Sequence, residues 1–332
     1  MQPNPSPCIA VIGAGAWGTA LANAAARAHR KVWLWTHRPE HAESLRKHRM
    51  NMTRLPGIPL ESEVHPTNSF EPLGEAQIVL LAVPAQITYD VGKRLVPFMR
   101  SDSVLLTCAK GIAQDSGLLM TDIIQKIWPQ GPYGILSGPS FATEVAQGLP
   151  TAVVIACSKG DDAHMCASAL TSPTFRIYHS VDLIGVALGG AIKNVLAIAA
   201  GMVQGRSLGE NARSALITRG FAEMNRFARA CGAQSSTLMG LSGLGDVILT
   251  CSSSQSRNFA LGHHLGSGGK SENSPLRLAE GAFTAPILLE KARTLGIDMP
   301  IVAAVVAILS HKASLDSVIH DLLERPIGPE TI

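Results

Sequence analysis

The chain has 332 residues, of which 46% are hydrophobic and 16% are charged, and its formal net charge is +3. This length and composition are typical of a globular protein with a substantial buried core, and they predict two domains. Basic and acidic residues are balanced along the chain, 15 to 13 in residues 1–180 and 13 to 12 in the remainder, which argues against a nucleic-acid partner.

From Cys8 to about Ser180, short apolar runs alternate with helical patterns, which predicts a parallel sheet flanked by helices. The expected strands are Cys8–Ile12, Val32–Trp35, Gln77–Val83, Ser103–Cys108, Tyr133–Ser137, Thr151–Cys157 and Phe175–His179. The expected helices are Trp17–His29, Ala85–Met99, Ser116–Trp128 and Asp161–Leu170. We therefore expect an α/β domain over residues 1–180.

A glycine-rich turn follows the first strand. Residues Gly13, Gly15 and Gly18 fit the pattern G-x-G-x-x-G between an apolar strand and an Ala-rich helix. The first glycine permits the tight turn, the second lets a pyrophosphate approach the backbone, and the third lets the helix pack on the strand. The free N–H groups at the helix start favour phosphate binding. The motif predicts a Rossmann-like dinucleotide-binding domain, and a tight turn without a ligand is the alternative.

The second strand ends in Thr36, His37 and Arg38, where NAD-specific sites carry a carboxylate. No acid at this point repels a 2′-phosphate, and Arg38 with His37 can contact one. We therefore expect NADPH to bind at least as well as NADH. In the alternative interpretation, Arg38 points into solvent.

After Ser180, long stretches rich in Ala, Leu, Met and Ile predict an all-α domain over residues 181–332. The expected helices are Leu183–Val203, Asn211–Cys231, a turn and helix through Gly243–Cys251, Ala285–Leu295, Ile301–Ser310 and Ser314–Leu323. The Gly/Ser/Asn-rich residues 266–274 are typical of a mobile surface loop.

Lys193 is the one charged residue between Leu183 and Val203. Desolvation lowers the pKa of an ammonium among apolar neighbours, so such a lysine can exchange a proton near neutral pH. Alternatively, Lys193 snorkels to the surface, or the segment spans a membrane. The glycines of this segment and the polar pair Lys193-Asn194 argue against a span. We therefore interpret Lys193 as a reactive or ligand-facing residue.

Four further clusters follow apolar runs or open helices. Lys110 follows a strand at the edge where such sheets bind ligands, and residues 137–142 follow the next strand with a Gly-Pro turn. Asp246 follows two glycines, and residues 256–258 combine Ser, Arg and Asn into a phosphate receptor. Taken singly, Lys110 can be a solvated cation, Arg257 half of a surface ion pair and Asp246 a helix cap. Together they favour reduction of a carbonyl on a phosphorylated substrate.

These segments resemble those of the bacterial NAD(P)-dependent sn-glycerol-3-phosphate dehydrogenases, from Ile9 to Pro326. The matching segments are Val11–Leu21, Ala109–Gly111, Leu136–Ala142, Leu188–Val195, Asn211–Gly220, Gly243–Asp246, Ser256–Asn258 and Ala279–Gly281. The resemblance implies reversible reduction of dihydroxyacetone phosphate to sn-glycerol 3-phosphate with NADPH or NADH, for phospholipid synthesis. It also implies a homodimer.

The resemblance further implies roles for individual residues. Lys193 matches the proton-transferring lysine, and Asn194 and Thr250 match supporting active-site groups. Substrate contacts are implied for Lys110, Gly138, Ser140, Lys193, Asp246, Ser256, Arg257 and Asn258. Cofactor contacts are implied for Ala16, Trp17, His37, Arg38, Lys110, Ala142, Arg257, Leu278 and Glu280, beside the motif glycines Gly13, Gly15 and Gly18. Two departures stand out: Ala16 replaces a common serine, and the stretch between Leu265 and Leu278 is shorter and richer in Gly and Ser.

In the expected reaction, Lys193 protonates the ketone oxygen, Asp246 holds Lys193 in place, and Arg257 anchors the phosphate. One rival is a β-hydroxyacid dehydrogenase acting on an unphosphorylated acid. Another is a non-catalytic sensor that binds NADPH. An assay of NADPH oxidation with dihydroxyacetone phosphate and with keto and hydroxy acids distinguishes the three.

Composition also bears on metals and location. Six cysteines without a C-x-x-C pair, and residues 1–7 without a basic or apolar stretch, favour reduced thiols in the cytoplasm and no secretory signal. His263 and His264 have no carboxylate or cysteine at ligand spacing, so we expect no metal site.

Overall fold

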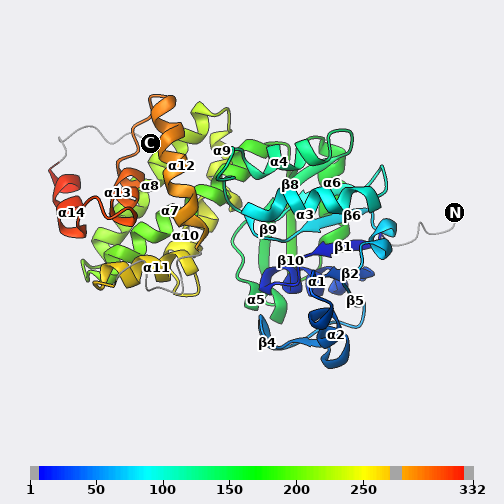
Figure 1. Ribbon diagram of the computed structural model, residues 1–332. Coiled ribbons are helices and arrows are strands. Elements are labelled where there is room, and N and C mark those ends of the chain that lie inside the picture. Colours follow the sequence, from blue (N-terminus) through cyan, green and yellow to red (C-terminus); the bar gives the residue numbers. More distant parts are fainter. Residues whose placement is uncertain (1–6, 270–278, 325–332) are drawn as a thin grey trace. The chain divides into compact units, whose positions relative to one another are not determined.

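The computed structural model describes residues 7–269 and 279–324, and it contains two compact units (Figure 1). The first unit comprises Met1–Ala109 and Met120–Leu183, and the second comprises Lys110–Leu119 and Ile184–Ile332. The ten-residue segment Lys110–Leu119 therefore packs with the helical residues that follow it much later in the chain. The predicted division into folding domains at residue 180 stays a prediction.

The first unit is built on an eight-stranded sheet with strand order β10-β9-β8-β7-β6-β1-β2-β5. The strands are β1 (Ile9–Ile12), β2 (Val32–Trp35), β5 (Val64–Thr67), β6 (Ile78–Leu81), β7 (Val104–Thr107), β8 (Tyr133–Ser137), β9 (Thr151–Cys157) and β10 (Phe175–Ser180). All the strands expected from the sequence are present. The edge strand β5 was not expected, because His65 and Pro66 interrupt its apolar pattern.

The central strands β1, β6 and β7 are almost entirely apolar because both faces of the sheet are covered where they lie. All four residues of β1, β6 and β7 are buried. Side chains alternate between two cores. Ile9 and Val11 pack on one face with α1 (Ala16–Arg27) and α6 (Gly160–Leu170). Ala10 and Ile12 pack on the other face with α3 (Thr88–Leu95) and α4 (Met120–Ile127). This two-face burial produces the continuous apolar runs that made the strands predictable.

The expectation of a parallel sheet is wrong at one place, since β9 runs antiparallel to β8 while β10 runs parallel to β9. The connection from β8 contains only the short helix α5 (Ala142–Gln147). Six helical residues span about 9 Å, whereas a five-residue strand spans about 17 Å. The helix alone therefore does not carry the chain back to the opposite edge, and β9 runs back from the carboxyl edge of the sheet.

The helices of the first unit are α1 (Ala16–Arg27), α2 (Pro39–His48), α3 (Thr88–Leu95), α4 (Met120–Ile127), α5, and α6 (Gly160–Leu170), with the two-stranded pair β3 (Met50–Asn51) and β4 (Leu55–Pro59). Sequence reasoning missed α2. Of its ten residues only Ala42 and Leu45 are buried, so it carries almost no apolar periodicity.

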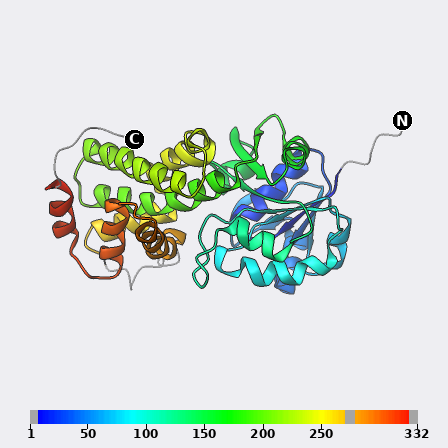
Figure 2. The same ribbon diagram turned by 90° about the horizontal axis from the view of Figure 1, so that it is seen from above.

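The second unit consists of helices over its described residues beyond 183 (Figure 2). They are α7 (Leu183–Gly205), α8 (Glu210–Ala230), α9 (Ser235–Leu238), the π-helical turn Leu241–Gly245, α10 (Asp246–Cys251), α11 (Arg257–Gly266), α12 (Glu280–Thr294), α13 (Pro300–Leu309) and α14 (Leu315–Leu323). The predicted helical second half is therefore confirmed, while α11 was not predicted. The expected surface loop over 266–274 lies partly outside the described residues.

Helix α7 forms the core of this unit. Every residue from 185 to 203 is buried, as expected for a helix that is apolar all round. By length and composition α7 could cross a membrane, but 89% of its apolar window is buried inside the structure. Helix α7 is therefore enclosed by protein, like the central helix of a globular unit.

Candidate active site

The glycine-rich turn joins β1 to α1, and its three glycines differ in their steric surroundings. Gly13 has φ +111°, and a Cβ there would lie 2.6 Å from the carbonyl oxygen of Ala82. A Cβ on Gly18 would overlap the carbonyl oxygen of Gly13, whereas a Cβ on Gly15 would meet nothing within 4 Å. The turn is thus tightly packed at Gly13 and Gly18 and unobstructed at Gly15, which is the N-cap of α1. The open side leaves room for a pyrophosphate beside the helix N-terminus.

Asn51 supports this turn, and sequence reasoning missed it. Its side chain is 1% exposed, and its Nδ2 donates to the carbonyl of Ala14 at 3.0 Å and to Oγ1 of Thr19 at 2.8 Å. Its Oδ1 contacts Nε2 of His41 at 3.3 Å. Asn51 lies in a two-residue strand far from the motif, so no local pattern pointed to it.

The remaining cofactor candidates of the first unit lie at the carboxyl ends of parallel strands. His37 and Arg38 follow β2, and both are exposed. Arg38 is the N-cap of α2. Ala16 and Trp17 open α1 and are partly buried against the sheet core, as is Ala142 at the start of α5. His37 and Arg38 are therefore accessible to solvent, and their contact with a cofactor stays a prediction.

Gly138 and Ser140 form the turn after β8. Gly138 has φ +135°, and a Cβ there would lie 2.9 Å from Cα of Val153. The hydroxyl of Ser140 donates to the carbonyl of Gly138 at 3.0 Å. The turn therefore needs glycine at its first position and holds the serine side chain by a local hydrogen bond.

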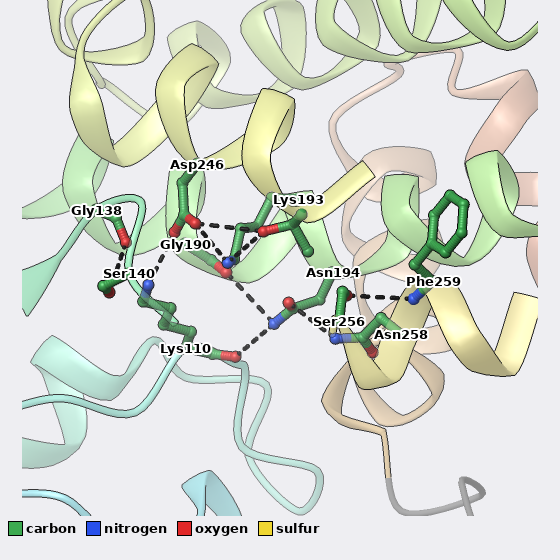
Figure 3. Close-up of polar contacts among 11 residues, drawn as sticks. Lys110, Gly138, Ser140, Gly190, Lys193, Asn194, Asp246, Ser256, Asn258 and Phe259 are labelled. Carbon is green, nitrogen blue, oxygen red and sulfur yellow. Dashed lines mark hydrogen bonds and ion pairs between the residues drawn. The ribbon is translucent and has the colours of Figure 1, made fainter. Parts of the chain in front are cut away.

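In the second unit, Lys193 is buried in an ion cluster (Figure 3). Its Nζ donates to Oδ1 of Asp246 at 2.6 Å and to Oγ1 of Thr250 at 2.7 Å. Oδ2 of Asp246 accepts from Nζ of Lys110 at 2.8 Å. The side chain of Asp246 is 1% exposed, and that of Lys193 is 9% exposed. Lys193 therefore does not snorkel to the surface, and Asp246 does more than cap a helix.

Burial lowers the pKa of Lys193 to about 8. The Asp246 carboxylate opposes this shift, and the positive charge of Lys110 adds to it. One carboxylate thus serves two lysines, so it only partly offsets the cost of burying the Lys193 ammonium. At this pKa, both protonation states of Lys193 are populated near neutral pH, as proton transfer requires.

Backbone packing places Asp246 over Lys193. Gly189 lies one helical turn before Lys193 on α7, and a Cβ on Gly189 would lie 2.5 Å from the carbonyl oxygen of Ser242. Ser242 belongs to the π-helical turn Leu241–Gly245, which ends directly at Asp246. Such π turns are frequent at functional sites. The close approach at Gly189 thus brings the start of α10 onto the lysine-bearing face of α7.

Asn194 joins Lys110 and α11 to the same helix. Its Nδ2 donates to the backbone carbonyl of Lys110 at 3.1 Å, and its Oδ1 accepts from Nδ2 of Asn258 at 2.9 Å. Oδ1 of Asn258 accepts from the backbone N–H of Gly281 at 2.9 Å. Lys110 lies in the segment whose bridge between Ile112 and Leu119 closes a loop of the second unit. Asn194 therefore links α7 to the Lys110 segment and to the start of α11.

The start of α11 forms the candidate phosphate receptor. Oγ of Ser256 caps the helix by accepting from the N–H of Phe259 at 3.2 Å, and Arg257 is exposed at the first helical position. A helix N-terminus with an exposed guanidinium attracts a phosphate dianion. Glu280 is half-buried at the first position of α12, and Leu278 lies outside the described residues. His263 and His264 lie in the last turn of α11.

The predicted residues therefore divide into two groups. The glycine turn, His37, Arg38 and the Gly138 turn belong to the first unit. The residues brought together in the second unit are Lys110, Lys193, Asn194, Asp246, Thr250, Ser256 and Asn258, with Arg257 at the same helix start. Their roles in binding and catalysis stay predictions.

Comparison with known proteins identifies the family. The family model for the N-terminus of NAD-dependent glycerol-3-phosphate dehydrogenase matches residues 8–163, and that for its C-terminus matches residues 182–320. The chain is 52% identical over 318 residues to the glycerol-3-phosphate dehydrogenase [NAD(P)+] of Azorhizobium caulinodans, covering 96% of this chain and 97% of the relative. It is 50% identical to the enzyme of the same name from Bradyrhizobium diazoefficiens, covering 97% and 98%.

A solved structure agrees with these relatives. The crystal structure of glycerol-3-phosphate dehydrogenase from Coxiella burnetii superposes with a TM-score of 0.90 at 36% identity, covering 96% of this chain and 99% of that one. The match covers nearly the whole length of both chains. This chain belongs to the NAD-dependent glycerol-3-phosphate dehydrogenase family.

Proposed function

We propose that the protein catalyses the reversible NAD(P)H-dependent reduction of dihydroxyacetone phosphate to sn-glycerol 3-phosphate. The observation that carries this proposal is the pair of buried residues Lys193 and Asp246, with the partly buried Lys110, beside the cationic start of α11. It combines a proton donor with a pKa of about 8 and a receptor for a phosphate, the two groups that this substrate needs. Relatives about 50% identical carry the corresponding enzyme name.

The glycine-rich turn fits a dinucleotide. The open side of Gly15 and the free N–H groups at the start of α1 would hold the pyrophosphate, and Ala16 and Trp17 lie in the same helical turn. Ala16 leaves the backbone donors in place but offers no hydroxyl. NAD(P)H, when bound, supplies the hydride that the ketone carbon receives.

Lys193 supplies the proton. As the ketone carbon gains hydride, negative charge develops on its oxygen, and the Nζ ammonium of Lys193 donates a proton to it. Asp246 holds Nζ in position through Oδ1. The oxidation of sn-glycerol 3-phosphate uses the neutral amine of Lys193 as the base. Lys110 and Thr250 complete the polar surroundings of the reacting oxygen.

The phosphate of the substrate binds at the start of α11. Arg257 provides a charged fork, and the backbone N–H groups of the first turn add donors. Substrate contacts by Gly138 and Ser140 are part of this proposal. Binding energy from the phosphate, which does not react, fixes the ketone for hydride transfer.

The coenzyme is NADH or NADPH, and we expect NADPH to be favoured. His37 and Arg38 are exposed after β2, where an acid would otherwise bind the ribose hydroxyl and repel a 2′-phosphate. We further expect a cytoplasmic homodimer that supplies glycerophospholipid synthesis. None of the six cysteines, all of which lie in the described residues, is in a disulfide, which supports a reducing compartment.

A spectrophotometric assay tests the proposed function. Adding dihydroxyacetone phosphate to the enzyme and NADPH should lead to loss of the NADPH absorbance, and adding sn-glycerol 3-phosphate to enzyme and NADP⁺ should lead to its gain. Turnover of 2-keto or 3-hydroxy acids in preference to the triose phosphate would instead indicate a β-hydroxyacid dehydrogenase. Tight NADPH binding with no turnover would indicate a sensor.

A further inference from the structure

Helices α7 and α11 pack backbone against backbone through glycines on both. A Cβ on Gly262 of α11 would overlap the carbonyl oxygen of Ile198 on α7, and a Cβ on Gly266 would overlap that of Met202. In the other direction, a Cβ on Gly201 would overlap the carbonyl oxygen of Phe259. Glycine destabilises the interior of a helix relative to alanine, so these residues do not stabilise α7 or α11 by themselves. What they permit is the close contact between the two backbones.

The contacts repeat every four residues on both helices. Asn258 hydrogen-bonds Asn194 at 2.9 Å, and the contacts of Gly262 with Ile198 and of Gly266 with Met202 continue the same row. Because the contacting positions advance by four residues on each helix and in the same direction, α7 and α11 run parallel and in fixed register.

A second row locks the same register. Gly201 contacts Phe259, and Gly205 contacts His263, again four residues apart on each helix. We call Gly201, Gly205, Gly262 and Gly266 the glycine ladder. Backbone atoms oppose backbone atoms along it, so α11 can neither slide by a fraction of a turn nor move away without breaking these contacts.

The ladder ends at the residues that carry the chemistry. Lys193 and Asn194 lie on α7 one to two turns before Ile198 and Gly201, and the receptor Ser256–Asn258 begins α11 one turn before Gly262. No flexible side chain intervenes between Gly262 and the carbonyl of Ile198. The backbone contacts therefore transmit the position of α7 directly to the start of α11.

We propose that the glycine ladder is a specificity-determining element that fixes the distance between Nζ of Lys193 and the phosphate receptor at the start of α11. This inference rests on the proposed function. A substrate must reach Nζ of Lys193 with its carbonyl and the start of α11 with its phosphate at the same time. The ladder therefore selects ketones whose carbonyl and phosphate are separated as in dihydroxyacetone phosphate. A homologue with one more methylene between them is a poor substrate.

The test compares three substrates in the wild type and in Gly262→Ala, with NADPH in each case. The substrates are dihydroxyacetone phosphate, its longer homologue 1-hydroxy-4-phosphooxybutan-2-one, and glycolaldehyde, which lacks the phosphate. Misplacement by about 1 Å costs on the order of 100-fold in rate. We expect kcat/KM for dihydroxyacetone phosphate to fall about 30- to 100-fold and that for glycolaldehyde to change less than about threefold, because only the phosphorylated ketone uses both points. The ratio of kcat/KM for dihydroxyacetone phosphate to kcat/KM for its longer homologue should be smaller in Gly262→Ala than in the wild type.

Two further variants keep the test decisive. Gly266→Ala lies one turn farther from the receptor and should show the same pattern with a loss of about 3- to 10-fold, so it decides the question if Gly262→Ala does not fold. Gly160→Ala in α6 is the matched control, since a Cβ there would meet only a side-chain atom of Val181 at 3.8 Å. It should leave all three substrates unchanged.

Equal losses with glycolaldehyde and dihydroxyacetone phosphate would overturn the inference, since they would indicate general damage. Unchanged kcat/KM for the phosphorylated ketone in a folded variant would overturn it as well. In either case wild-type turnover of dihydroxyacetone phosphate leaves the proposed function standing. A wild type that does not reduce dihydroxyacetone phosphate would overturn the proposed function and this inference together.

Discussion

The glycine-rich turn of the first unit and the lysine cluster of the second prepare for their ligands by opposite physical means. The turn presents backbone N–H groups and empty space at Gly15, and it carries no ionised side chain between Gly13 and Gly18. The cluster places the buried ammonium of Lys193 and the partly buried ammonium of Lys110 around the carboxylate of Asp246. The first suits an anion that is bound without being changed. The second suits a proton that must move.

The comparison predicts which changes affect chemistry and which affect binding. A backbone site tolerates many side-chain changes nearby, because its donors belong to the main chain. A buried ion cluster does not, because each partner offsets the desolvation of the others. Substitutions in the cluster should therefore have the largest effects on turnover.

Lys193→Ala should produce the largest effect. Removing the general acid should lower kcat about 100-fold or more, while Asp246 keeps Lys110 as its partner. Steady-state kinetics and a fluorescence titration with NADPH measure the two properties separately, and NADPH affinity should stay near that of the wild type. Lys193→Arg is the control, because it keeps the positive charge but holds its proton too tightly to donate it. A Lys193→Ala enzyme that turns over at nearly the wild-type rate would refute the assignment.

Arg257→Ala should come next and should act on binding. Loss of charged hydrogen bonds to a phosphate costs about 1.5–3 kcal/mol, which corresponds to a rise of about 10- to 100-fold in KM for dihydroxyacetone phosphate. The rate with glycolaldehyde, which has no phosphate, serves as the internal reference. Arg257→Lys keeps the charge but not the planar guanidinium. Its KM for dihydroxyacetone phosphate should lie between those of the wild type and Arg257→Ala. An unchanged KM in Arg257→Ala would remove this residue from the phosphate site.

The same contrast explains what the sequence could predict. The glycine turn is contiguous, and each of its glycines answers a local steric need, so residues 13–18 were sufficient to predict it. Lys193 was conspicuous as a single charge in an apolar helix. Its partners were not, since Asp246 and Lys110 are far from it in sequence and were connected to it through the family resemblance.

Other features depend on tertiary packing that no local pattern encodes. Helix α11 was missed because its Asn, two His and two Gly residues are weak helix formers, and its glycines make sense only against α7. The reversal of β9 follows from the shortness of α5, whose helical pattern extends over fewer than two turns. Asn51 supports the turn from a separate hairpin and carried no sequence signal.

The pH dependence of turnover should show the charge balance of the cluster. Because Lys193 has a pKa of about 8, the kcat of ketone reduction, which needs the ammonium, should fall as pH rises through about 8. The kcat of sn-glycerol 3-phosphate oxidation, which needs the neutral amine, should fall as pH drops through the same value. Rate profiles in both directions measure these inflections.

Lys110→Met sharpens this test. The charge of Lys110 lowers the pKa of Lys193, so removing it should move both inflections to higher pH. Lys110→Arg keeps the charge and should leave the inflections close to those of the wild type. Identical inflections in Lys110→Met and the wild type would show that another group titrates.

The smallest effect should come from Arg38→Ala, on the backbone-dominated side of the comparison. Arg38 is exposed, so water screens its contact with a 2′-phosphate, and such a contact contributes only about 0.5–1.5 kcal/mol. The KM for NADPH should rise about 3- to 10-fold while that for NADH stays constant, because NADH has no 2′-phosphate for the guanidinium to contact. Parallel measurements with both coenzymes isolate the phosphate contact from any general change in the turn. Equal changes for NADPH and NADH would contradict a 2′-phosphate role, because they would place Arg38 beside a part that both coenzymes share.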